Sequence, residues 1–160
     1  MFAAAAPWIK LIYASALAIA AGWLTARLAR PLPRIAAPCL ALLLVVCAMA
    51  FLGLNSVLAT PHGERVAAVL GKTWFECPIM VLGFSLPALA GTLWAVRGLA
   101  PTRLRGAGFA AGLLAGCVGA FGYALACPEG SAVFVAVWYS IGICLTALLG
   151  AMLGRRVLWW

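Results

Sequence analysis

The stretch that decides the fold is residues 35–54, IAAPCLALLLVVCAMAFLGL, which contains no charged residue. A helical residue advances the chain by about 1.5 Å, so about 20 apolar residues cross the roughly 30 Å hydrocarbon core of a bilayer. The run is continuous and lacks the alternation of polar and apolar residues that is typical of a membrane β-strand. The stretch therefore predicts a transmembrane helix.

Four further stretches repeat this pattern, at residues 8–26, 73–96, 106–126 and 133–153. The chain of 160 residues is 67% hydrophobic and only 9% charged, with a mean hydropathy of +1.14. A soluble domain has about a quarter of its residues charged. We therefore predict an all-α, polytopic transmembrane helical bundle with five spans, which forms one domain over residues 1–160.

The basic residues predict how this bundle is oriented in the membrane. Eight arginines flank the predicted spans on one side of the membrane: Arg27, Arg30, Arg34, Arg97, Arg103, Arg105, Arg155 and Arg156. The other three basic residues and all three acids fall on the opposite side: Lys10, Arg65, Lys72, Glu64, Glu76 and Glu129. Because cytoplasmic loops carry the excess of Lys and Arg, the C-terminus is predicted inside and the N-terminus of this chain outside. The net charge of +8 is divided among small groups between apolar runs, so it does not indicate nucleic-acid binding.

The fourth predicted span has glycines at the spacing GxxxG, at positions 108, 112 and 116. Such spacing lets helix backbones approach closely in lipid, and it favours tight packing within one bundle. The sequence has no Gly-rich phosphate loop, no aspartate and no paired carboxylates within a span. We therefore predict neither an enzyme nor a bound cofactor. The scarcity of ionisable residues within the spans also disfavours a transporter.

Six cysteines are the remaining source of chemistry. Cys47, Cys117 and Cys144 lie inside spans, where a thiol commonly packs as a small apolar group. Cys39 lies near the predicted cytoplasmic end of its span, where reducing conditions disfavour a stable disulfide.

Cys77 and Cys127 differ, because each is followed by proline and each lies at the predicted outer end of a span. The two spans are antiparallel neighbours in sequence, so their outer ends can be close. Glu76, Glu129 and His62 are predicted on the same face, and thiols with carboxylates and imidazole bind soft divalent metals. Neither CxxC nor HxxxH spacing occurs here, so no metal site is assigned. Three interpretations stay open: reversible thiol chemistry or soft-metal capture, a structural disulfide, and packing.

The motif WFECP and the longer stretch GYALACPEGSAVFVAVWYSIGICLTALLGAMLGRR resemble the NrsF family, the negative regulators of sigma F. The resemblance covers nearly the whole chain and is most specific over residues 106–156. It implies a bacterial inner-membrane anti-sigma factor with six spans, which holds an extracytoplasmic-function sigma factor. It also implies that two periplasm-facing cysteines sense heavy metal or oxidant, and these match Cys77 and Cys127. The expected partners are the sigma factor, the lipid bilayer and a heavy-metal ion at the thiols, without direct nucleic-acid contact.

One departure from the family pattern concerns the beginning of the chain, which looks like the family's second span. We expect the leading span and a preceding cytoplasmic segment to be missing from it. The alternative interpretation is a quinone-linked membrane thiol-disulfide oxidoreductase. That class of enzyme needs closely paired cysteines, whereas Cys77 and Cys127 are single and far apart in sequence.

Overall fold

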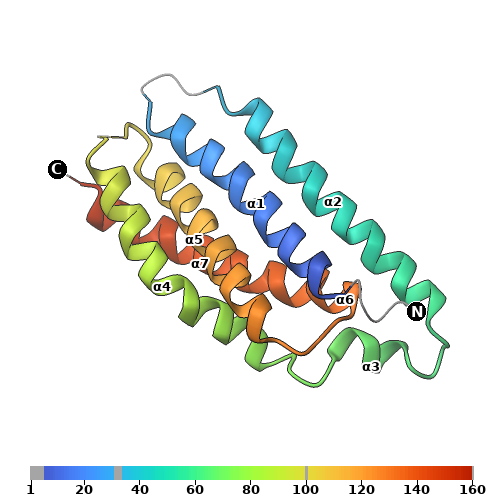
Figure 1. Ribbon diagram of the computed structural model, residues 1–160. Coiled ribbons are helices and arrows are strands. Elements are labelled where there is room, and N and C mark those ends of the chain that lie inside the picture. The colour runs from blue at the N-terminus through green and yellow to red at the C-terminus, as the bar shows by residue number, and fades with distance from the viewer. Residues whose placement is uncertain (1–5, 31–33, 100, 160) are drawn as a thin grey trace.

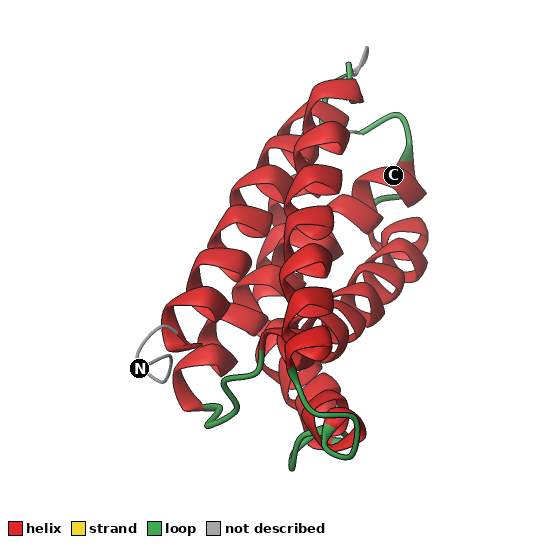
Figure 2. Ribbon diagram, turned by 90° about the vertical axis from the view of Figure 1, so that its right-hand side faces the viewer, coloured by secondary structure: helices red, strands yellow, loops and turns green. Residues whose placement is uncertain are grey.

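A computed structural model of the chain describes residues 6–30, 34–99 and 101–159. These residues form helices and loops only (Figures 1 and 2). Five helical segments are long and apolar enough to cross a membrane: α1 (Ala6–Leu28), α2 (Ala36–Ala59), α4 (Glu76–Arg97), α5 (Leu104–Ala126), and a fifth that joins α6 (Ala132–Phe134), the π-helical turn η1 (Val135–Tyr139) and α7 (Ser140–Val157). A short helix, α3 (Arg65–Leu70), lies between α2 and α4. The predicted all-α bundle with five spans is confirmed.

The helix ends differ from the predicted spans by a few residues. The second predicted span stops at residue 54, before Asn55 and Ser56, but α2 continues to Ala59. The Asn55 side chain donates to the Phe51 carbonyl oxygen at 2.8 Å, and the Thr60 hydroxyl donates to that of Ser56 at 2.8 Å. Because the Asn55 side chain bonds to its own helix, it does not end α2, which stops only at Thr60, where the backbone becomes extended.

Helix α5 lies at the centre of the bundle and α2 at its edge (Figure 1). In an 18-residue apolar window of each helix, 56% of the residues of α5 are buried, against 17% of those of α2. α5 packs most extensively on α7, followed by α4 and α1. α2 packs mainly on α1 and α6, and it leaves large side chains such as Leu43, Leu44 and Phe51 exposed. In a membrane this apolar face is solvated by lipid.

The glycine spacing in α5 lets this helix contact α7 closely. A Cβ atom added at Gly108 would collide with the Gly150 carbonyl group, and one at Gly112 would collide with the main chain of α7 at Thr146. The missing side chains let the two backbones touch, as small residues do in membrane helices. The prediction of close packing within one bundle is confirmed. We call this contact the glycine seam.

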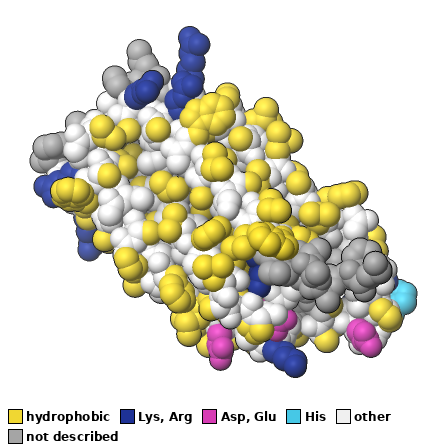
Figure 3. Space-filling model, in the orientation of Figure 1, with side chains coloured by type: hydrophobic (Ala, Val, Ile, Leu, Met, Phe, Trp, Pro, Cys, Tyr) yellow, Lys and Arg dark blue, Asp and Glu magenta, His cyan; other side chains and the backbone are white. Residues whose placement is uncertain are grey.

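The two ends of the bundle differ in chemistry (Figure 3). The arginine end contains the α1–α2 and α4–α5 connections and the end of α7, with the eight arginines named above. The cysteine end contains α3, α6, Cys77 and Cys127, together with the three glutamates. On the visible face, hydrophobic side chains separate the basic end from the end with carboxylates. The charge separation seen in the sequence is therefore also a separation in space.

Candidate functional site

The structure brings Cys77 and Cys127 together at the cysteine end. Cys77 is the second residue of α4, and Cys127 directly follows the last residue of α5. The two side chains belong to one buried cluster, with 0% and 6% of their surfaces exposed. Cys127 is a near neighbour of the Cys77 thiol in this cluster. Each of the six cysteines is a free thiol in this structure. Residues separated by fifty positions in sequence thus form a buried pair of thiols.

Proline fixes the position of each thiol at a helix end. Pro78 occupies the first turn of α4, where its missing N–H is not needed by the helix. Pro128 has the opposite role, because the residue before a proline is pushed toward extended backbone. Cys127 accordingly has φ −75° and ψ 124°, and α5 ends there. The same dipeptide therefore starts one helix and ends its neighbour at the same end of the bundle.

A lysine is the unexpected member of the site. Lys10 in α1 is only 3% exposed, and its Nζ donates to the Cys127 carbonyl oxygen at 2.6 Å. The carbonyl groups at the end of a helix lack intrahelical partners and carry partial negative charge, so they are a favourable place for an ammonium group. Sequence analysis assigned Lys10 only to the positive charges of the outer side. Its position within an apolar span was the signal that could have identified it.

Two tyrosine side chains lie beside the thiol pair in the core of the bundle. Tyr123 of α5 and Tyr139 of η1 have ring centroids 5.9 Å apart. Cys77 and Cys127 lie near both hydroxyl groups. Within the described part of the chain, the Tyr139 hydroxyl and the Thr73 hydroxyl are buried and have no hydrogen-bond partner. The two thiols thus lie beside two tyrosine hydroxyl groups in an otherwise apolar core.

The segment that leads into Cys77 is attached to the fifth span. The Trp138 indole Nε1 donates to the Val69 carbonyl oxygen of α3 at 2.8 Å. The Glu129 carboxylate accepts a hydrogen bond from the Lys72 backbone N–H at 2.8 Å. Between them, Gly71 has a φ of +60° and packs so closely on Phe134 that a side chain would collide with the ring. Sequence analysis did not predict these contacts, and they order the chain just before α4.

The structure does not assemble the acids and the imidazole into a metal centre with the thiols. Across the ranges that the structure describes, no three His, Cys, Asp or Glu side chains are placed to hold a metal ion together. His62 and Glu76 are exposed, and Glu129 is engaged with Lys72. The available ligands for a soft metal at this end are therefore the two thiols.

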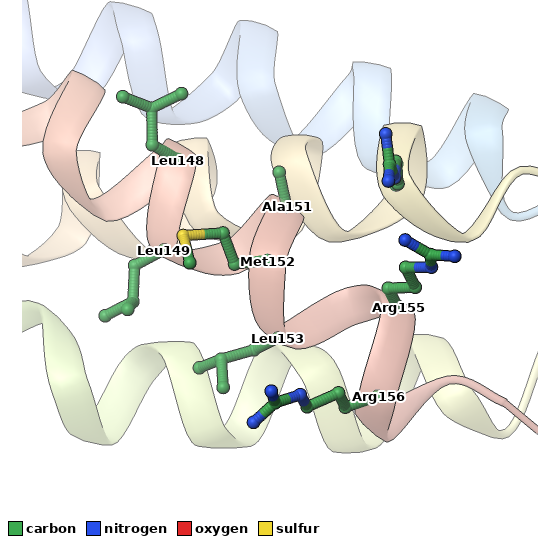
Figure 4. Close-up of a pocket in the computed structure, with 8 residues that line it drawn as sticks. Leu148, Leu149, Ala151, Met152, Leu153, Arg155 and Arg156 are labelled. Carbon is green, nitrogen blue, oxygen red and sulfur yellow. The ribbon is translucent and has the colours of Figure 1, made fainter.

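A groove of about 660 Å³ lies at the arginine end (Figure 4). Its apolar surface comes from α7, including Leu148, Met152 and Leu153, and its basic residues are Arg105, Arg155 and Arg156. The groove is thus at the opposite end of the bundle from the thiols. Any influence of the thiols on this end must pass along the helices.

Five spanning helices with a buried thiol pair at one end and arginines at the other define a polytopic helical membrane protein. The model of the family "Negative regulator of sigma F", NrsF, matches residues 1–160. The chain therefore belongs to the NrsF family, as the sequence resemblance indicated.

Two relatives support this assignment. The chain is 38% identical over 153 residues to the "Probable anti-sigma-F factor NrsF" of Azospira oryzae. It is also 38% identical over 154 residues to the "Anti-sigma-F factor NrsF" of Caulobacter vibrioides. Each alignment covers 96% of this chain and 72% of the relative. No solved structure matches the chain significantly.

Proposed function

We propose that this chain is a membrane anti-sigma factor that holds an extracytoplasmic-function sigma factor and releases it when Cys77 and Cys127 react. Membership of the NrsF family supports the anti-sigma activity. The buried pair of free thiols is the single observation that supports the sensing role. The paired thiols would also suit the alternative of a quinone-linked oxidoreductase, so it is membership of a regulatory family that favours the anti-sigma function.

The proposed orientation places the arginine end in the cytoplasm and the cysteine end in the periplasm of a bacterial inner membrane. The eight arginines at one end, against three basic residues at the other, support it. The N-terminus of this chain is then periplasmic and the C-terminus cytoplasmic. The sigma factor meets the arginine end, whereas metal or oxidant arrives from the periplasm.

Two reactions fit a pair of thiols. An oxidant that accepts two electrons and two protons converts Cys77 and Cys127 into a disulfide, which requires Cα atoms within about 7 Å. A soft divalent cation instead displaces the two thiol protons and is held by two thiolates. Either product joins the first turn of α4 to the end of α5. This local event can bias a helical bundle between two packings.

A sigma-dependent reporter tests the proposal in the bacterium that encodes the chain, with the gene at its own locus. Deletion of the gene should raise reporter output, and cadmium or diamide should raise it in the wild type. The variant Cys77→Ser, Cys127→Ser should repress the reporter but not respond to either agent. The matched control is Cys47→Ser, Cys144→Ser, which changes two exposed thiols and should respond like the wild type.

Two outcomes contradict different parts of the proposal. Unchanged reporter output after deletion of the gene would contradict the anti-sigma activity. An undiminished response to both agents in the Cys77→Ser, Cys127→Ser variant would contradict the sensing role and leave the anti-sigma activity intact.

A further inference from the structure

Lys10 is a charged group in an unusual place. Its ammonium group is buried near the beginning of a membrane-spanning helix, and ionisable side chains in such positions are rare and generally functional. An ammonium group offers three N–H donors, and a buried one is strongly unfavourable without a partner. In the described residues it donates to the carbonyl oxygen of Cys127, one of the two candidate sensing residues. The bond therefore connects α1 directly to the thiol site.

Helix α1 is placed to carry a displacement from one end of the bundle to the other. It packs mainly on α5 along its length, and it begins at the cysteine end and ends at the arginine end (Figure 1). Arg27 lies in the last turn of α1, and the α1–α2 connection follows it.

We propose that Lys10 is the coupling residue that transmits the reaction of the thiols to α1. This inference rests on the function proposed above. The accepting oxygen and the reacting sulfur belong to the same residue, so a bond from the Cys127 sulfur to Cys77 or to a shared metal ion repositions the Cys127 main chain. The hydrogen bond to Lys10 is then weakened, and the buried ammonium group loses its partner. α1 responds by moving relative to α5, because packed helices shift between discrete arrangements.

The test compares Lys10→Met with Tyr13→Phe in the reporter strain. Methionine is unbranched like lysine and of similar length, but it has no N–H donor. Tyr13→Phe instead removes the hydrogen bond between the Tyr13 hydroxyl and the Ser140 hydroxyl of α7, which is 2.7 Å long. Lys10→Met should raise unstressed reporter output about fivefold or more, within the usual range of allosteric coupling. It should do so equally in the Cys77→Ser, Cys127→Ser background, because the coupling residue acts after the thiols. Tyr13→Phe should respond like the wild type.

Three outcomes separate the hypotheses. If deletion of the gene leaves the reporter unchanged, the proposed function fails. If the wild type represses and Lys10→Met represses equally, the coupling role of Lys10 is overturned. If Lys10→Met derepresses only when both cysteines are present, Lys10 acts on the thiols themselves, and the coupling role is likewise overturned.

A second measurement uses the unmodified chain and is independent of how well Lys10→Met accumulates in the membrane. Amide hydrogen exchange is followed in the purified chain in lipid nanodiscs, before and after oxidation by diamide. The first turns of α1 should exchange faster after oxidation, while the centre of α5 stays protected. Unchanged exchange in α1, with the Cys77–Cys127 disulfide verified by mass spectrometry, would overturn the proposal.

Discussion

At the scale of single residues, the two prolines help to place Cys77 at the start of one helix and Cys127 at the end of its neighbour. Pro78 is accepted in the first turn of α4, whereas Pro128 favours extended backbone at Cys127, so α5 ends at Ala126. Sequence analysis identified both Cys-Pro pairs and predicted that they share one side of the membrane. It did not reveal that the thiols are buried, because burial depends on Tyr123, Tyr139 and other side chains from distant segments. It also missed Lys10, whose partner is a main-chain oxygen that no side-chain pattern encodes.

The pairing of the thiols leads to a prediction about which cysteines react with each other. Treatment of the purified chain with diamide should produce an intramolecular disulfide between Cys77 and Cys127, because these thiols are neighbours in the core. Cys47 and Cys144, which are exposed on the bundle surface, provide the internal control and should remain reduced. Peptide mass spectrometry after alkylation identifies the linked pair. Recovery of Cys77 and Cys127 as separately alkylated peptides would contradict the placement of the two helix ends.

At the scale of helices, the glycine seam and the attachment of α3 were predictable to different degrees. The GxxxG spacing predicted a close helix contact but not its partner, which is α7. The continuous apolar run of the fifth span gave no sign of the π-helical turn η1. This turn carries Trp138, which holds α3, and Tyr139, which lies by the thiols. Such turns recur at functional sites and depend on tertiary packing, so local sequence did not reveal it.

Two glycines of α5 provide a matched test of the seam. A Cβ atom at Gly112 would meet the α7 backbone, whereas one at Gly122 would meet nothing within 4 Å. Gly112→Ala should destabilise the bundle by about 1–3 kcal/mol, as overpacking does. Gly122→Ala should be neutral or stabilise it by up to about 1 kcal/mol, because alanine favours a helix. Thermal unfolding in detergent, followed by tryptophan fluorescence, compares the two. Equal stability of the variants would contradict the backbone contact between α5 and α7.

At the scale of the whole molecule, composition and hydropathy were sufficient to predict the bundle. Five apolar stretches became five spanning helices, since nothing but a helix satisfies the backbone of a continuous apolar run in lipid. The arrangement of the helices, with α5 central and α2 at the edge, was not predictable. Every span is apolar on most faces, so the pattern does not say which face meets protein and which meets lipid.

The proposed orientation predicts which loops face the periplasm. In a background with all six cysteines replaced by alanine, His62→Cys should react with a membrane-impermeant maleimide on intact bacteria. Thr102→Cys should react only after the membrane is permeabilised. Both positions are exposed, so solvent access does not separate them. Labelling of Thr102→Cys alone on intact cells would reverse the orientation and place the thiols on the cytoplasmic side.

The glycine seam also determines which parts of the bundle can change their relative positions. Where backbones touch without side chains between them, no rotamer change can absorb sliding, so α5 and α7 form one rigid unit. Arg105 of α5 and Arg155 and Arg156 of α7 all belong to this unit, which fixes the shape of the groove they border. We therefore expect a thiol reaction to leave that groove unaltered. Under the proposed coupling, what changes at the arginine end is the position of α1, which ends at Leu28, relative to this unit.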